Sequence, residues 1–191
     1  VPYISSLLVS GNNIWVGTYE GLYVIEKGEK ARCLVDGPEF YRLFESSSGE
    51  VWAGCRTGGL YRIMPDEKVI WYSDSNAEPY HIESNQIRSF AEDRFGNIWF
   101  GTFLGLHKYN PYTDKFTVYR QDHLPGSLSH SSVFSVYIDT QATIWVGTYY
   151  GGANYFNPEK EIFAHYTDNP FRKECLNYSF VGHLAEDKNG N

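Results

Sequence analysis

The chain has 191 residues, of which 42% are hydrophobic and 20% charged, and this length is sufficient for one substantial core. Its formal net charge is −7 and no basic stripe is present, which argues against nucleic-acid binding by this segment, because such binding needs clustered cations. No run of about 18 apolar residues occurs, so we expect no membrane insertion. An aromatic content of 17% and 18 glycines favour β structure.

A five-residue phrase built on tryptophan recurs four times. The tryptophans, Trp15, Trp52, Trp99 and Trp145, are separated by 37, 47 and 46 residues, close to the period of about 40–50 residues typical of a four-stranded propeller blade. Each phrase contains a glycine, and we expect these glycines, like the tryptophans, to serve the scaffold. They are Gly17, Gly54, Gly101 and Gly147.

Short apolar segments flank each phrase in the order expected of a blade. After each phrase comes a glycine and a second strand, as at 21–25, 59–63, 105–109 and 152–156, and each pair is typical of a β-hairpin. Further strands are predicted at 68–72, 116–119 and 162–166, and strands precede the phrase at 87–93 and 133–139.

We therefore predict an all-β fold, a partial β-propeller of about four four-stranded antiparallel blades plus the first strand of a fifth. The blades are placed at about 1–36, 37–75, 85–122 and 131–168, with the next blade starting at 178–191. Because the turn signature at 93–97 recurs at 186–191 without a following tryptophan, we expect a fragment of a longer propeller. An open arc, and a ring closed by two chains, remain alternatives.

The three cysteines, Cys33, Cys55 and Cys175, show no C-x-x-C spacing, so neither a disulfide framework nor a zinc site is indicated, and we expect buried structural thiols. Six histidines form no paired metal motif. The residues at 187–191 resemble a calcium loop but lack its later glutamate, and a simple turn is the preferred interpretation. We expect no metal, no cofactor and no catalytic residue.

The phrases I-W-[VF]-G-T-x-x-G and E-D-x-x-G-N-I-W, at their clearest in 90–111 and 133–158, resemble the two-component regulator propeller repeat. The resemblance implies the periplasmic sensor region of a Bacteroides-type hybrid two-component system, part of a larger histidine kinase that works as a homodimer and detects oligosaccharides from polysaccharides. Departures are local: Cys55 replaces threonine, the first spacing is short, and 141–143 lacks the usual glycine.

Ligand contacts are expected where the blades differ, in the connections of the inner hairpins and the loops between blades, which face the mouth of a propeller channel. The alternative is that these positions are ordinary solvated residues. The candidates are Tyr19, Arg56, Tyr149 and Tyr150 from the hairpins, and His81, His130 and Arg172 from the loops.

Two other functions are alternatives to a sensor. The turn before Trp99 resembles the Asp-box of sialidase propellers, and fold alone does not exclude a glycoside hydrolase. However, Ile98 precedes the tryptophan and the arginines are scattered, which disfavours it. A protein-interaction scaffold would differ from a sensor only in its ligand.

Overall fold

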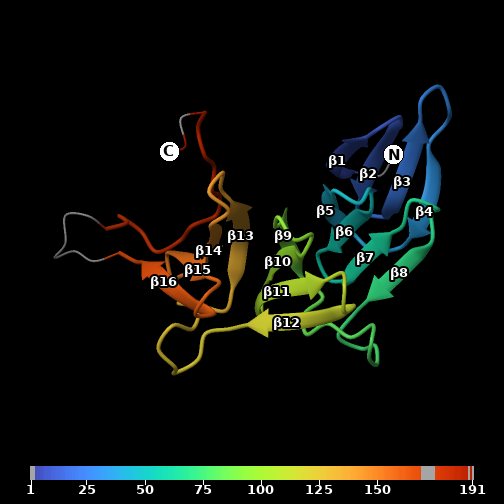
Figure 1. Ribbon diagram of the computed structural model, residues 1–191. Helices are drawn as coiled ribbons and strands as arrows, with labels where there is room; N and C mark the ends of the chain where they lie inside the picture. Colours follow the sequence, from blue (N-terminus) through green and yellow to red (C-terminus); the bar gives the residue numbers. More distant parts are fainter. Residues whose placement is uncertain (1–2, 169–174, 189, 191) are drawn as a thin grey trace. The chain divides into compact units, whose positions relative to one another are not determined.

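The computed structural model describes residues 3–168, 175–188 and 190. The described residues form four sheets, each of four antiparallel strands in sequential order, and no helix (Figure 1). This confirms the predicted fold class of a partial β-propeller. No helix in this part of the chain is long and apolar enough to cross a membrane.

The chain divides into two compact units, Val1–Arg88 and Ser89–Asn191. The first two blades are β1 (Ile4–Ser10), β2 (Asn13–Thr18), β3 (Gly21–Glu26) and β4 (Arg32–Asp36), then β5 (Phe40–Glu45), β6 (Val51–Cys55), β7 (Leu60–Ile63) and β8 (Val69–Tyr72). The last two blades are β9 (Ile87–Glu92), β10 (Ile98–Thr102), β11 (Gly105–Asn110) and β12 (Lys115–Tyr119), then β13 (Val133–Ile138), β14 (Ile144–Thr148), β15 (Ala153–Asn157) and β16 (Ile162–Tyr166).

The tryptophan phrase is the second strand of every blade. β6 and β10 are buried along their whole length, as expected for a strand covered on both faces. Trp15, Trp52 and Trp99 are buried, and Trp145 is half-buried.

The glycine of the phrase permits close approach of the chain segment that follows the blade. A Cβ at Gly17 would collide with the carbonyl oxygen of Phe40, at the start of β5, and one at Gly101 would collide with Val133, at the start of β13. At Gly147 the colliding group is the carbonyl oxygen of Val181.

Each unit has its own core, built from residues of its consecutive blades. In the first unit it consists of Trp15, Leu22, Val24, Phe40, Val51, Ala53, Cys55 and Ile63. In the second unit it consists of Trp99, Leu106, Leu128, Val133, Val136, Ile144, Val146, Phe156 and Phe163.

The segment 178–191 differs from the prediction, since its described residues form no strand. A strand requires a hydrogen-bonded ladder, whereas Val181 makes a single backbone hydrogen bond to the Thr148 carbonyl, 3.0 Å long. Val181 nevertheless occupies against Gly147 the place that Phe40 occupies against Gly17. The segment therefore lies where an inner strand would begin without being paired as one.

The cysteines also depart in part from expectation. Cys55 is buried and Cys175 half-buried, but Cys33, on β4, is exposed. The outer strand of a blade has one unpaired edge, and every second side chain along it points to solvent.

Candidate ligand-binding surface

A β-bulge interrupts the first strand of at least three blades, near its start. In β1 the pairing passes from Ile4 opposite Thr18 to Ser6 opposite Gly17, which leaves Ser5 as the extra residue. The same shift leaves Tyr41 as the extra residue in β5 and Phe134 in β13. A bulge bends the strand and redirects the side chain of the extra residue.

In the second and fourth blades the redirected side chain meets the first residue of the following hairpin connection. In the second blade the guanidinium carbon of Arg56 lies 5.5 Å from the centre of the Tyr41 ring. In the fourth blade the rings of Phe134 and Tyr149 are stacked, 5.5 Å apart at 20°. Arg56 and Tyr149 were candidates from the sequence, and the bulge residues beside them were not.

The second unit carries an aromatic cluster around this contact, formed by His130, Phe134, Tyr149, Tyr150 and Phe180. The Tyr149 and Tyr150 rings lie 4.1 Å apart and the His130 ring lies 6.0 Å from Tyr150. Phe180 packs edge-on against Phe134 at 5.0 Å and against Tyr149 at 5.7 Å. Tyr150 is 62% exposed, Phe180 42% and Tyr149 40%, so much of this aromatic surface faces solvent. The interaction with the Tyr149 side chain raises the pKa of Tyr150.

The first unit carries a different group at the corresponding place, the tyrosine–arginine cluster of Tyr41, Arg42, Arg56 and Arg88. The guanidinium carbon of Arg42 lies 5.0 Å from the Tyr41 ring, and its Nε donates to the Arg88 carbonyl over 2.8 Å. Burial raises the pKa of Tyr41, while the charges of Arg42, Arg88 and Arg56 oppose that shift.

The remaining candidates lie in varied surroundings. Tyr19 is 50% exposed and its ring lies 5.8 Å from that of Tyr3. His81 is half-buried, with Nδ1 3.2 Å from the Asn76 carbonyl in its own loop. His130 Nδ1 accepts a hydrogen bond from the Ser132 amide over 3.0 Å. Arg172 lies outside the described residues.

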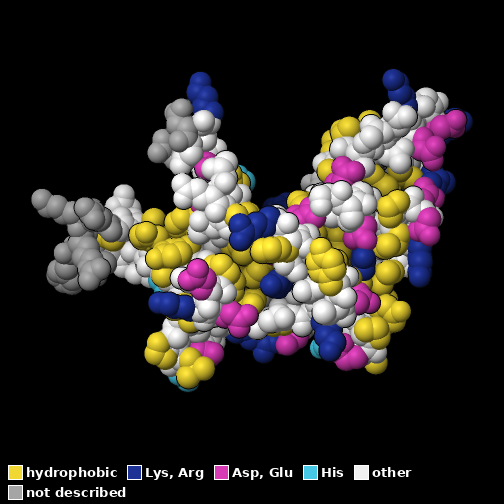
Figure 2. All heavy atoms as spheres, viewed as in Figure 1, with side chains coloured by type: hydrophobic (Ala, Val, Ile, Leu, Met, Phe, Trp, Pro, Cys, Tyr) yellow, Lys and Arg dark blue, Asp and Glu magenta, His cyan; other side chains and the backbone are white. Residues whose placement is uncertain are grey.

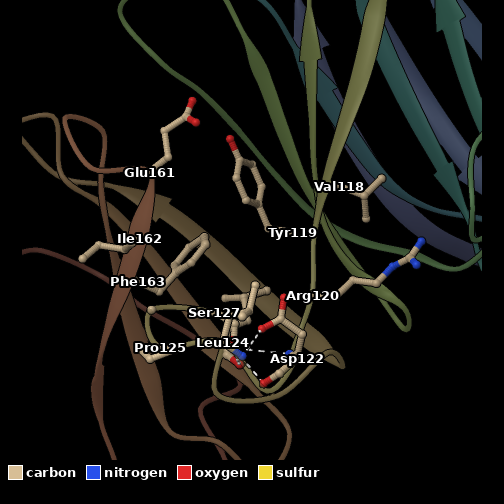
Figure 3. Close-up of a pocket in the computed structure, with 12 residues that line it drawn as sticks. Val118, Tyr119, Arg120, Asp122, Leu124, Pro125, Ser127, Glu161, Ile162 and Phe163 are labelled. Carbon is tan, nitrogen blue, oxygen red and sulfur yellow. Dashed lines mark hydrogen bonds between the residues drawn. The ribbon is translucent and has the colours of Figure 1, made fainter.

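A separate pocket of about 290 Å³ lies between the outer strands β12 and β16 and the loop of residues 124–128 (Figure 3). Tyr119 and Phe163 form its aromatic wall, with ring centres 5.6 Å apart. The Tyr119 hydroxyl and the Glu161 carboxylate point toward the same side of it in Figure 3. Burial, followed by the charge of Glu161, raises the pKa of Tyr119. The loop is closed by Asp122, which accepts hydrogen bonds from Leu124 and Ser127.

Neither the charge distribution on the face shown in Figure 2 nor the metal-ligating side chains among the described residues indicate another candidate site. On the face shown in Figure 2, acidic, basic and hydrophobic side chains are interspersed. Among the described residues, no group of three or more His, Cys, Asp or Glu side chains is placed to hold a metal ion.

The chain is similar to known propellers and to proteins of two-component signalling. Residues 81–103 match the family described as two component regulator propeller. The chain contains a two-component regulator propeller repeat. A curated relative, histidine kinase P4 of Formosa agariphila, is 32% identical over 126 residues, which are 59% of this chain and 9% of that protein. The repeat-bearing chain thus spans only a small part of that relative.

Solved structures share the propeller fold at low sequence identity. The extracellular domain of the hybrid two component system BT3049 from B. thetaiotaomicron aligns with 96% of this chain and 24% of its own, at 21% identity and a TM-score of 0.71. The extracellular domain of the one component system BT4673 from the same organism aligns with 98% of this chain and 25% of its own, at 19% identity and a TM-score of 0.75. This chain therefore shares the propeller fold of these extracellular domains.

Proposed function

We propose that this chain is a ligand-binding segment of an extracytoplasmic sensor propeller and that it binds oligosaccharides derived from polysaccharides. The aromatic cluster is the observation that carries this proposal. Five aromatic or imidazole rings from three places in the chain, 130–134, 149–150 and 180, meet there and remain accessible to solvent.

The chemistry of the cluster suits a sugar. The C–H-rich face of a pyranose ring packs against exposed aromatic faces, while the tyrosine hydroxyls and the imidazole nitrogens can exchange hydrogen bonds with sugar hydroxyls. The cluster also lies on a rigid support, because Phe134 belongs to a bulged strand and Tyr149 follows β14 directly. Rigid aromatic side chains lose little conformational entropy on binding.

The proposed setting of the segment is supported by its relatives. The match to a histidine kinase and the likeness to extracellular domains of two-component systems support a periplasmic location in a larger kinase-containing protein. Binding would then be relayed to a kinase outside this segment, and we propose that the parent protein is a homodimer. The segment itself is proposed to be non-catalytic.

Isothermal titration calorimetry against a panel of plant and host oligosaccharides tests the proposal. We expect saturable heat with at least one glycan class, and a loss of about tenfold or more in affinity for Tyr150→Ala, the size of effect found when a contact aromatic is truncated. Tyr112→Ala is the matched control, because Tyr112 is 83% exposed and lies in the β11–β12 turn. Equal affinities of the two variants, or no heat with any glycan, would overturn the proposal.

A further inference from the structure

Three arginines gather around one tyrosine in a chain whose net charge is −7. Arg42 and Arg56 place their guanidinium carbons 5.0 and 5.5 Å from the centre of the Tyr41 ring. Arg88 is held beside them, because its carbonyl accepts the Arg42 Nε hydrogen bond and its charge acts on the Tyr41 hydroxyl. Like charges brought together in this way repel one another, so the fold alone gains little from the arrangement.

Arg56 is paired with a carboxylate. Glu39 Oε2 accepts a hydrogen bond from Arg56 Nε at 2.9 Å. Within the described part of the chain, the two terminal nitrogens of Arg56 donate no hydrogen bond, and its side chain is 62% exposed. Arg42 and Arg56 together therefore carry two positive charges against the one negative charge of Glu39.

Arg42 has spare donors as well. Its Nε donates to the Arg88 carbonyl and its Nη1 to its neighbour's carbonyl at Tyr41, over 2.8 and 2.9 Å. These bonds fix the orientation of the guanidinium, and among the described residues Nη2 has no acceptor. A pre-oriented, exposed guanidinium with free donors suits carboxylate and sulfate oxygens, which accept paired N–H groups.

We propose that the tyrosine–arginine cluster binds the carboxylate or sulfate group of an acidic oligosaccharide, with the Tyr41 ring as the adjoining apolar surface. The inference rests on the proposed function and adds the class of ligand. The tyrosine–arginine cluster would bind the charged group by itself, and the aromatic cluster is a separate site that would bind sugar rings irrespective of charge.

The test pairs each acidic probe with an uncharged one of equal length. Galacturonate oligosaccharides are compared with their methyl esters, and sulfated dextran oligosaccharides with dextran oligosaccharides, by calorimetry at about 50 mM and about 300 mM salt. We expect an acidic probe to bind about tenfold or more tightly than its uncharged partner, and to lose affinity at the higher salt concentration. A response to one probe pair alone identifies carboxylate or sulfate as the group bound.

Variants connect the effect to these side chains. Arg42→Gln and Arg56→Gln should each lower the affinity for the acidic probe about tenfold, and Arg56→Lys should retain part of it. Arg32→Gln is the control, because Arg32 is exposed and is paired with Glu67 on the outer side of its blade. Thermal melts verify folding of Arg56→Gln, which leaves Glu39 without its partner.

The outcomes separate the two proposals. Equal binding of acidic and uncharged probes that still depends on Tyr150 overturns the anion site and leaves the proposed function standing. Acidic-probe binding that is unchanged in Arg42→Gln and Arg56→Gln also overturns the anion site. Absence of binding by every probe overturns both.

Discussion

The indole nitrogen of Trp145 donates a hydrogen bond to the carboxylate of Asp139, with 2.8 Å between Nε1 and Oδ2. The other carboxylate oxygen accepts the backbone amides of Gln141 and Thr143 over 3.0 and 2.7 Å. One side chain thus closes the turn between β13 and β14 and attaches it to the tryptophan of the blade. Asp93 and Trp99 repeat the arrangement at 2.8 Å in the preceding blade.

Replacing the carboxylate by an amide should weaken this attachment. We expect Asp139→Asn to lower the free energy of unfolding by about 1–3 kcal/mol, because it removes charge-assisted hydrogen bonds and turns one acceptor into a donor facing a donor. Asp66→Asn is the control, since Asp66 is exposed and accepts one backbone hydrogen bond, from Lys68. Urea denaturation measures both, and equal losses would contradict the prediction.

The same carboxylate predicts a pH dependence. Burial raises the pKa of Asp139, but the hydrogen bonds from Trp145, Thr143 and Gln141 outweigh it and hold the pKa below its usual 3.8. A carboxyl group whose pKa is lower in the folded chain than in the unfolded chain stabilises the fold at pH values above its unfolded pKa. This stabilisation is lost as the pH falls through the folded pKa. Below about pH 4, the urea concentration at the midpoint of unfolding should therefore decrease as the pH falls. This decrease should be less steep in Asp139→Asn than in the parent chain. Identical slopes would show that Asp139 is not responsible.

More of the propeller scaffold than of the candidate ligand-binding surface could be predicted from the sequence. The tryptophan spacing and the turn at 93–97 predicted four blades, because both signals depend on local hydrogen bonding and on alternating burial. Arg56 and Tyr149 could be chosen because the blades differ there. The bulge residues Tyr41 and Phe134 could not, since a bulge is defined only by the register between two strands and leaves no periodic trace in one of them.

The buried histidine at position 107 on β11 should give the stability of the fold a second, separate pH dependence. His107 is fully buried and stacks on Phe100 at 4.9 Å and 21°, and neither ring nitrogen has a hydrogen-bond partner among the described residues. Burial lowers the pKa of His107 to about 4. The unfolded chain, with a histidine pKa of about 6.5, binds the proton more readily, so stability should decline as pH falls below that value and level off near 4.

Chemical denaturation between pH 7 and pH 4 measures this loss, which should be on the order of 3 kcal/mol. His107→Phe removes the titrating group while keeping an aromatic ring, and should flatten the profile. His123→Gln, at an exposed position, should leave the profile unchanged. A profile that is equally steep in His107→Phe would assign the effect to other groups.

The absence of a side chain at Gly17 allows the first two blades to pack closely. A Cβ there would collide with the Phe40 carbonyl oxygen and the Ser6 hydroxyl, and backbone cannot move aside as easily as the end of a side chain. We expect Gly17→Ala to cost about 3 kcal/mol. Gly28→Ala is the comparison, because Gly28 has open space around it but a φ of +89°, so its cost of about 1 kcal/mol is backbone strain alone. Equal unfolding midpoints for the two variants would refute the packing argument.

Cys33 and Cys55 should differ in reactivity, although neither forms a disulfide. Cys33 is exposed on β4, whereas Cys55 is fully buried in the core of the first unit. Burial, followed by the charge of Glu39, raises the pKa of the Cys55 thiol, and the thiolate is the reactive form. N-ethylmaleimide followed by mass mapping should therefore modify Cys33 in the native chain and Cys55 only after denaturant is added. In Cys33→Ser the prompt modification at position 33 is lost, and any rapid modification of Cys55 under native conditions would mean that the core between the first two blades opens readily.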